Sequence, residues 1–281
     1  MQVFTTPGTL SAWSDAQRVA GNRVALVPTM GALHEGHLAL AAEARRHAHV
    51  VVVSIFVNPL QFNRADDFAA YPRPIDDDLA VCATAGVDAV YAPTAAEMYP
   101  EGFQTHVEPG ALAEVLEGAH RPGHFRGVTT VVAKLFGAAR PHVAVFGQKD
   151  YQQLTIVRRM VTDLDMGLEV VALPTVREAD GLALSSRNRR LTAEQRAAAL
   201  CVPRSLAAVQ SALADGERNT ARLVAVAKAV VEAEPLARFE HLEIVHPDTL
   251  AALLEVAGPA VAVTAVWFGD VRLIDNALLA G

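Results

Sequence analysis

Two histidines, His34 and His37, stand three residues apart between an apolar run and an Ala/Leu-rich run. Gly31 precedes them and Gly36 lies between them; both glycines allow tight turns and a close approach of the backbone to a ligand. A helix that starts near Glu35 or Gly36 would direct its unpaired N–H groups and the positive end of its dipole outward, which suits an anion. The i, i+3 spacing puts both imidazoles on one helical face, where they can donate hydrogen bonds to phosphate oxygens. The stretch therefore predicts a phosphate site.

A metal site and a packing role are the alternatives for these histidines. The HExxH spacing of a zinc helix is absent, and no third ligand is evident. Neither of the two cysteines, Cys82 and Cys201, lies in a CxxC or Cys/His cluster, which argues against a metal centre and a disulfide. Two thiols in a chain of this length suit a reducing compartment.

Uncharged amides follow the apolar run HVVVVSIFV. Asn58 and Gln61 come directly after it, and amides suit the recognition of hydroxyl groups and a carboxylate. For Asn58, an Asx turn before Pro59 explains the residue equally well. Gln61 has no such local role, so it is the stronger candidate for a ligand contact.

Charged and hydroxyl side chains stand in two later segments. In FGQKDYQQL, Gly147 permits a tight turn, Lys149 is a compact cation for phosphate charge, and Asp150 can accept from ribose hydroxyls. Gln153 lies four residues beyond Lys149, on the same side of a helix that starts there. In READGLALSSRN, two serines and an arginine can close over a triphosphate; these are Ser185, Ser186 and Arg187.

Alternating elements must position these residues. The β-branched runs RVALVP, HVVVVSIFV, DAVYAP, HVAVFG and LEVVALP alternate with helix-like stretches, which predicts an α/β fold with a doubly wound parallel sheet (Rossmann-like). Such sheets bind ligands at the carboxyl ends of their strands. After Pro174 the pattern changes to Ala-rich helices, the first interrupted at Pro203, and two strands. We therefore expect a domain at 1–175 and a smaller α+β domain at 176–281.

The composition is that of an ordinary globular protein. The 281 residues are 52% hydrophobic and 20% charged, with a net charge of −7, so disorder is excluded and a nucleic-acid partner is not expected. The N-terminus lacks a signal-peptide pattern, and the longest apolar stretches are too short for a membrane span. We expect a cytoplasmic protein without a membrane partner.

The spaced motifs carry a family resemblance. PTMGALHEGH resembles the HxGH signature of the adenylate-transferring nucleotidyltransferases, a superfamily that includes class I aminoacyl-tRNA synthetases. Together with FVNPLQF, RPGHFRGVTTVV, FGQKDYQQL, READGLALSSRN and VRLIDN, it resembles the pantothenate synthetase (pantoate–β-alanine ligase) family. The resemblance extends from about residue 23 to residue 276.

The resemblance implies an AMP-forming ligase that joins (R)-pantoate to β-alanine through a pantoyl adenylate, with ATP as substrate and a homodimeric assembly. It implies that His37, with His34 beside it, donates to the phosphate being transferred. Mg²⁺ would be held through ATP phosphates and waters, without direct protein ligands expected. Catalytic residues would be His34, His37, Lys149, Ser185, Ser186 and Arg187. Pantoate or β-alanine would contact Gln61, Gln153 and Asn58. The ATP site would comprise Met30, Gly31, Ala32, Leu33, His34, Glu35, Gly36, His37, Gly147, Gln148, Lys149, Asp150, Val176, Leu184, Ser185, Ser186 and Arg187.

Several roles stay open at this level. Asp76–Asp78 fit helix capping and dipole compensation, or a water-mediated Mg²⁺ contact. His124 and Arg126 fit an active-site role, a dimer contact or a plain helix start. The departures from the family pattern at His246 and at Trp267–Asp270 affect the lid and the dimer rather than the chemistry. Two other functions remain as alternatives: a nucleotidyltransferase with another acceptor, and a non-catalytic nucleotide-binding module.

Overall fold

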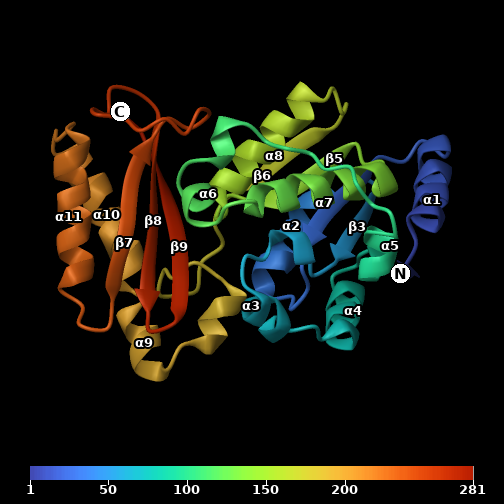
Figure 1. Cartoon of the computed structure of the whole chain (residues 1–281), viewed down its shortest axis with the longest axis horizontal. Helices are drawn as coiled ribbons and strands as arrows, with labels where there is room; N and C mark the ends of the chain where they lie inside the picture. The colour runs from blue at the N-terminus through green and yellow to red at the C-terminus, as the bar shows by residue number, and fades with distance from the viewer. Residues whose placement is uncertain (281) are drawn as a thin grey trace. The chain divides into compact units, whose positions relative to one another are not determined.

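The computed structural model describes residues 1–280, which form two compact units. The first contains Met1–Gln148 and Gln152–Leu173, and the second contains Lys149–Tyr151 and the chain from Pro174 onward. Figure 1 shows the elements of each unit. The second unit thus includes three residues that follow the fifth strand of the first.

The first unit is built on a six-stranded parallel sheet. Its strand order is β1-β4-β3-β2-β5-β6, and every pairing is parallel. The order reverses between β2 and β5, so the carboxyl ends of these strands form a switch point where such sheets bind ligands. The strands are β1 (Gln2–Phe4), β2 (Val24–Thr29), β3 (Val50–Ile55), β4 (Ala89–Tyr91), β5 (Val143–Gly147) and β6 (Glu169–Leu173).

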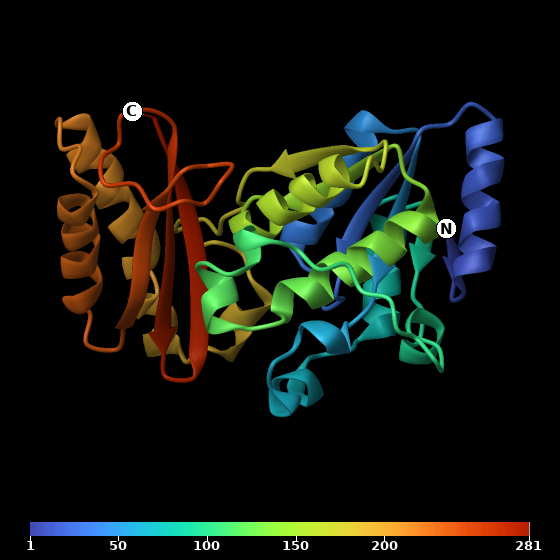
Figure 2. The same cartoon turned by 45° about the horizontal axis from the view of Figure 1, so that its top comes forward.

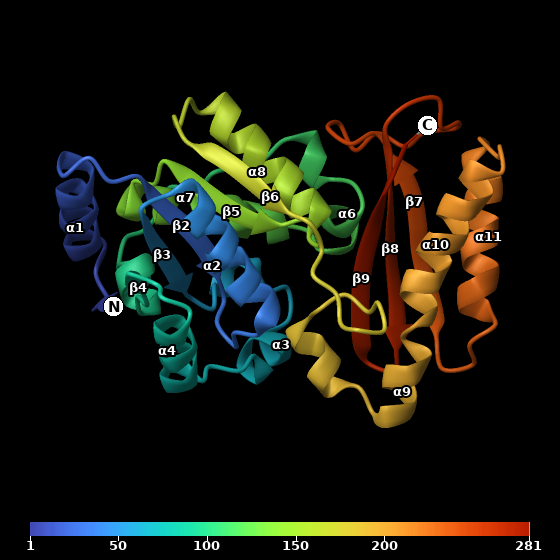
Figure 3. The same cartoon turned by 180° about the vertical axis from the view of Figure 1, so that it is seen from behind.

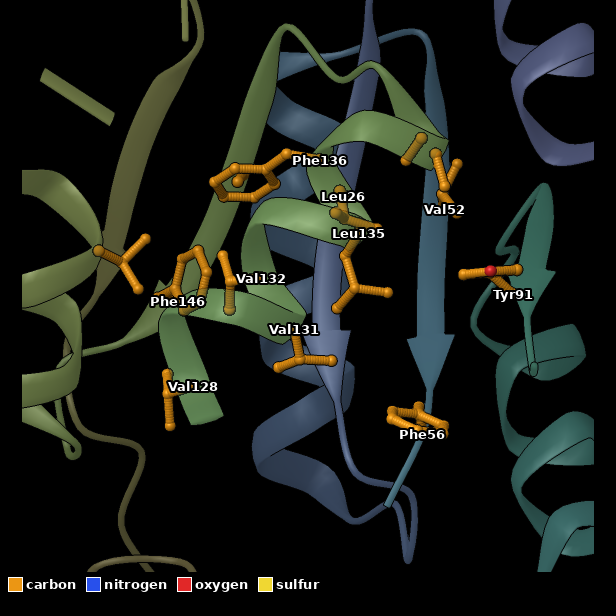
Figure 4. Close-up of a cluster of buried hydrophobic side chains, with 14 of the residues drawn as sticks. Leu26, Val52, Phe56, Tyr91, Val128, Val131, Val132, Leu135, Phe136 and Phe146 are labelled. Carbon is orange, nitrogen blue, oxygen red and sulfur yellow. The ribbon is translucent and has the colours of Figure 1, made fainter. Parts of the chain in front are cut away.

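Helices cover both faces of this sheet because the central strands are apolar on both sides. Alternate residues of β2 face opposite ways: Leu26 packs with α1 (Pro7–Val19), α7 (His124–Ala139) and α8 (Tyr151–Asp163), and Val27 packs with α2 (Glu35–His47) and α4 (Ile75–Thr84). Figure 4 shows the first of these clusters. α7 lies in front of the sheet in Figure 1, and α2 lies in front of it in the opposite view of Figure 3. The predicted doubly wound α/β fold is confirmed.

Shorter elements connect the strands at the edge where the polar motifs stand. The turn η1 follows β3, and three short helices and a second turn lie between β3 and α7. Their bounds are η1 (Pro59–Gln61), α3 (Ala65–Ala70), α5 (Ala95–Met98), η2 (Ala111–Ala113) and α6 (Glu117–His120). β1 and α1, at residues 2–19, were not predicted from the sequence.

The second unit is a three-stranded antiparallel sheet with helices on one face. β7 (Arg238–Val245), β8 (Ala260–Phe268) and β9 (Val271–Leu279) pair in that order. α10 (Cys201–Ala214) and α11 (Thr220–Glu232) pack together against this sheet, as Figure 2 shows. The predicted smaller α+β part is confirmed, and β9 is a strand that the sequence pattern did not predict.

The predicted interruption at Pro203 is present. α9 (Ala193–Ala198) ends before α10 begins at Cys201, and the N–H of Val202 bonds to the carbonyl of Ala199. Pro203 is the third residue of α10, where a missing N–H costs nothing because the first turn has no intrahelical acceptor. Counted together as Ala193–Ala214, this is the one helical stretch of the described chain that is long and apolar enough to cross a membrane. Its residues Leu206, Val209 and Leu213 are buried in the core of the second unit, so the stretch packs as a core helix.

Candidate active site

The chain between β2 and α2 turns sharply at Gly31. Gly31 has φ +81°, and a Cβ built on it would lie 2.8 Å from Oδ2 of Asp78. Ala32 follows with φ +52°, a backbone region that costs a residue with a side chain about 1–2 kcal/mol. Thr29 supports the turn, because its Oγ1 accepts from the Gly31 N–H at 3.2 Å and donates to the Ser54 carbonyl at 2.6 Å. Only glycine fits this position without displacing its neighbours.

A buried carboxylate holds the turn from the other side. Asp78 is 2% exposed, and its two oxygens accept from the N–H groups of Ala32 at 2.8 Å and Leu33 at 2.7 Å. These two amides therefore donate to the protein, and any contact of Ala32 or Leu33 with ATP must use other atoms. Asp76 and Asp77 are exposed in the first turn of α4, where they compensate the helix dipole. The three consecutive aspartates thus divide between two roles.

The same carboxylate affects a neighbouring thiol. Burial, and to a lesser extent the charge of Asp78, raises the pKa of the Cys82 thiol to about 11. The thiol stays protonated at neutral pH, which is the opposite of what a nucleophile or a metal ligand requires. Cys82 is thus a packing residue of a buried hydrophobic cluster.

The two histidines cap the start of α2. His34 is the N-cap residue, and its Nδ1 accepts from the Gly36 N–H at 3.2 Å. Nδ1 of His37 accepts from the His34 N–H at 3.3 Å, and the two ring centroids lie 4.1 Å apart. Each ring thus pairs with an N–H group that a helix start otherwise leaves without an intrahelical partner. The predicted helix start near Glu35 is confirmed.

These contacts determine which nitrogen of each neutral ring carries the proton. A ring nitrogen that accepts from a backbone N–H has its lone pair there, so the proton of the neutral ring is on Nε2. His34 and His37 therefore both present an Nε2–H donor. Two oriented donors beside a helix N-terminus suit negative charge that develops on a phosphate.

Asn58 and Gln61 follow β3 and are buried. Asn58 is 1% exposed; its Nδ2 donates to Oε1 of Gln61 at 2.9 Å and to the Gly127 carbonyl at 3.0 Å. Its Oδ1 accepts from the Leu60 N–H at 3.2 Å, which is the Asx turn that the sequence allows, and from the Tyr99 hydroxyl at 2.7 Å. Asn58 thus serves as a junction between η1, α5 and α7.

The start of α7 supports the backbone of Gln61. The Gln61 carbonyl accepts from Nδ1 of His124 at 2.8 Å and from the Arg121 guanidinium at 3.0 Å. Nε2 of Gln61 lies 3.1 Å from Sδ of Met30, which is a weak acceptor. For His124 the structure thus provides a role behind Gln61, whereas Arg126 pairs with a surface glutamate at 3.2 Å.

In the second unit, β9 supports Lys149 and the segment that precedes the serines. Nδ2 of Asn276 donates to the Lys149 carbonyl at 2.9 Å. Asp275 is 3% exposed and accepts from both terminal nitrogens of Arg177, at 2.7 and 3.0 Å. The Lys149 side chain is mostly buried, with Nζ 3.8 Å from Oδ1 of Asp150. The VRLIDN motif thus contributes the two polar residues that hold these segments.

The segment between β6 and α9 forms a tight hairpin followed by a 3-10 turn. The Leu184 N–H donates to the Val176 carbonyl at 2.9 Å. Ser185 is the N-cap of η3 (Ser186–Arg190), and its Oγ accepts from the Arg187 N–H at 3.2 Å. This contact uses an acceptor of the Ser185 hydroxyl, whose O–H can still donate.

Each unit has a pocket beside its predicted site residues. In the first, the turn residues Met30 and Gly31 line a hollow of about 740 Å³, counting space open to solvent, between α4 and the carboxyl ends of β3 and β4. In the second, Lys149, Ser185 and Arg187 line one pocket together with Asp275. Gly147, Gln148 and Gln153 belong to the first unit, where Gln153 lies half-buried on the first turn of α8.

The residues that depart from the family pattern have local structural contacts. Nδ1 of His246 accepts from the Asp248 and Thr249 N–H groups at the end of β7. Nε1 of Trp267 donates to Glu240, which also accepts from Arg272 at 2.7 Å. Burial opposes the ionisation of Glu240, but the hydrogen bond and charge of Arg272, together with the Trp267 hydrogen bond and the neighbouring His241, lower the pKa of this carboxyl.

A doubly wound parallel sheet with a glycine turn and a histidine-capped helix after its second strand has the features that the resemblance to the HxGH class of α/β nucleotidyltransferases implies. Comparison with known proteins narrows this class. The chain belongs to the pantoate-beta-alanine ligase family, whose model matches residues 2–278.

Relatives match over almost the whole length. The pantothenate synthetase of Moorella thermoacetica is 50% identical over 279 residues, covering 99% of each chain. A solved pantothenate synthetase from Thermus thermophilus has a TM-score of 0.93 and 47% identity, covering 99% of each chain. The pantoate-beta-alanine ligase of Francisella tularensis, solved with beta-gamma ATP and beta-alanine, has a TM-score of 0.81 and 32% identity, covering 99% of this chain and 97% of that one.

Proposed function

We propose that this enzyme condenses (R)-pantoate with β-alanine and uses ATP, forming pantothenate, AMP and pyrophosphate. In the first step a pantoate carboxylate oxygen attacks the α-phosphorus of ATP, and pyrophosphate leaves. In the second step the β-alanine amine attacks the activated carbonyl, an amide bond forms, and AMP leaves with the bonding electron pair. The chain's own groups bind, orient and stabilise charge, and no covalent enzyme intermediate is required.

The paired histidines carry this proposal. His34 and His37 both direct an Nε2–H donor from a helix N-terminus, because their Nδ1 atoms are engaged by backbone N–H groups. In the first step, negative charge builds on the oxygens around the α-phosphorus, and fixed donors stabilise that charge without reorganising. We assign His37 as the main donor to the phosphate being transferred and His34 as its neighbour.

The second unit supplies cationic and hydroxyl groups for the leaving pyrophosphate. Lys149, Ser185, Ser186 and Arg187 would stabilise the β- and γ-phosphates, and three of them already lie together around one small pocket. Mg²⁺ would neutralise phosphate charge when bound with ATP. Both oxygens of Asp78 accept backbone N–H groups, so the residues present fit a metal held by phosphates and waters rather than by this carboxylate.

Pantoate would be held by Gln61 and Gln153, with Asn58 behind Gln61. The remaining expectations are that the enzyme is a cytoplasmic homodimer of two domains, 1–175 and 176–281, and that the second acts as a lid. It would bind neither nucleic acid nor membrane. The net charge of −7 is unfavourable for a nucleic-acid partner.

Pantoate-dependent exchange between labelled pyrophosphate and ATP tests the proposal. Pantoate is expected to start the exchange in the absence of β-alanine, because the adenylate forms reversibly. Exchange without pantoate would instead indicate a transferase with another acceptor, and no exchange with pantoate would indicate a nucleotide-binding module.

Single-residue variants test the assigned roles. His37→Ala and Lys149→Ala are each expected to slow adenylation about 100-fold or more, the loss typical of a removed transition-state donor. His47→Ala is a matched control on the same helix α2, since it removes a partly exposed pair with Glu43. Pyrophosphate release in a single turnover is the measurement, and an unchanged rate in a variant would remove that residue from its role.

A further inference from the structure

Asn58 is saturated by hydrogen bonds within the protein. The Leu60 N–H and the Gly127 carbonyl identify which amide atom is the oxygen and which is the nitrogen, because one can only donate and the other can only accept. The Tyr99 hydroxyl donates to the second acceptor site of Oδ1, and the second N–H of Nδ2 donates to Oε1 of Gln61. An asparagine amide offers two donors and two acceptor sites, so all of them are engaged.

The orientation of Asn58 determines the orientation of Gln61. Oε1 of Gln61 accepts from Nδ2 of Asn58, so the NH₂ group of Gln61 must point the other way, to Sδ of Met30. A thioether is a weak acceptor that a ligand oxygen can replace with a net gain. Gln61 therefore offers N–H donors, which select an acceptor oxygen such as a carboxylate.

Tyr99 is the outermost member of this chain of contacts. Its hydroxyl donates at 2.7 Å, the shortest of the four contacts to Asn58. Its ring is fixed by Phe56, at a centroid distance of 6.1 Å, and by Phe103, at 5.0 Å. Burial raises the pKa of the Tyr99 hydroxyl, so the group stays protonated and remains a donor at neutral pH.

We propose that Tyr99 is a positioning residue for pantoate: through Asn58, it holds the Gln61 amide with its NH₂ group toward the substrate oxygens. The proposal rests on the proposed function for the identity of the substrate. The hydrogen bonds from Tyr99 through Asn58 to Gln61 form a relay, and this relay depends only on contacts within the first unit.

Tyr99→Phe tests the relay with little risk to the fold, because the ring and its aromatic neighbours are retained. Loss of one buried hydrogen bond typically corresponds to about a fivefold change. We expect the Kd of pantoate to rise about fivefold by calorimetry, while the Kd of ATP changes less than twofold. Tyr91→Phe is the matched control, since it removes the hydroxyl of another buried tyrosine of the same unit that is not one of the four hydrogen-bond partners of Asn58. Equal weakening of both ligands, or an unchanged pantoate Kd, would overturn the proposal.

A double-mutant cycle asks whether Tyr99 acts through Gln61. In a Gln61→Ala background, Tyr99→Phe should weaken pantoate by less than twofold, because the group that it positions is absent. A full fivefold effect in that background would exclude the relay.

Side-chain amide NMR separates the relay from the identity of the substrate. The Gln61 NH₂ signal, assigned by its disappearance in Gln61→Ala, should shift in Tyr99→Phe and stay in place in Tyr91→Phe without any ligand. An unmoved signal in Tyr99→Phe contradicts the relay. If the signal shifts but wild-type protein does not bind pantoate, the relay stands and the proposed function fails.

Discussion

At the scale of single residues, Asp78 shows how a side chain can serve the site without facing the ligand. Asp78→Asn retains size but offers one acceptor oxygen to two N–H groups. Hydrogen bonds to a charged acceptor contribute about 1.5–3 kcal/mol each, and a buried unpaired N–H costs about 1–3 kcal/mol. We expect the free energy of unfolding in urea to fall by about 2 kcal/mol, and the rate of adenylation to fall at least tenfold because the turn before His34 shifts.

Asp77→Asn provides the comparison for this prediction. It removes the same charge from an exposed position in the same helix turn, where the dipole contribution is about 0.3–1 kcal/mol. Comparable losses in the two variants would mean that the charge near α4, and not the two amide contacts, supports the turn.

Residue types and local spacing predict only part of this site. The histidine pair and the helix start follow from a local motif, because capping and i, i+3 geometry are set within a few residues. The pairings of Asp78 with Ala32, of Tyr99 with Asn58 and of Asp275 with Arg177 join residues 41 to 98 positions apart. Such pairings depend on tertiary packing. The sequence does not show that Asp78 is buried while the neighbouring aspartates are exposed.

At the scale of elements, α7 approaches η1 so closely that one glycine is required between them. A Cβ on Gly127 would lie 2.3 Å from the Leu60 carbonyl oxygen and 2.7 Å from the Gln61 nitrogen. Gly127→Ala therefore has to push η1 away, and overpacking of this kind costs about 1–3 kcal/mol. We expect weaker pantoate binding together with a lower thermal midpoint.

Gly137→Ala on the same helix is the control for the Gly127 prediction. Gly137 is exposed, and its added Cβ would meet no atom within 4 Å. Alanine should stabilise α7 there by up to about 1 kcal/mol, since glycine disfavours a helix interior. A Gly127→Ala protein that is as stable and active as Gly137→Ala would contradict the close approach.

Elements were predictable where their periodicity was strong. The central strands are apolar on both faces, so β2, β3 and β5 stand out as continuous runs. β9 mixes Arg272, Asp275 and Asn276 into a strand, because these polar residues hold Lys149 and Arg177 or pair with Glu240. These polar residues interrupt the apolar pattern by which the strand could have been predicted from the sequence.

At the scale of the whole molecule, the proposed chemistry draws on both compact units. The histidines belong to the first unit, and Lys149, Ser185 and Arg187 belong to the second. Lys149 lies two residues beyond β5 in sequence, yet it groups with the later part of the chain. A local sequence pattern does not reveal this grouping, because it arises from contacts such as that of Asn276 with the Lys149 carbonyl.

A double-mutant cycle between His37→Ala and Lys149→Ala asks whether the two units act in one phosphoryl-transfer step. Each single variant is expected to lose about 100-fold in adenylation. If both groups stabilise one transition state on the same nucleotide, their effects couple by about 1 kcal/mol or more, so the double variant should lose at least about fivefold less than the product of the single losses. Single-turnover pyrophosphate release with saturating ATP and pantoate measures all four proteins of the cycle. A double loss within twofold of that product would show that His37 and Lys149 contribute independently, and the cooperation proposed between the two units would have to be abandoned.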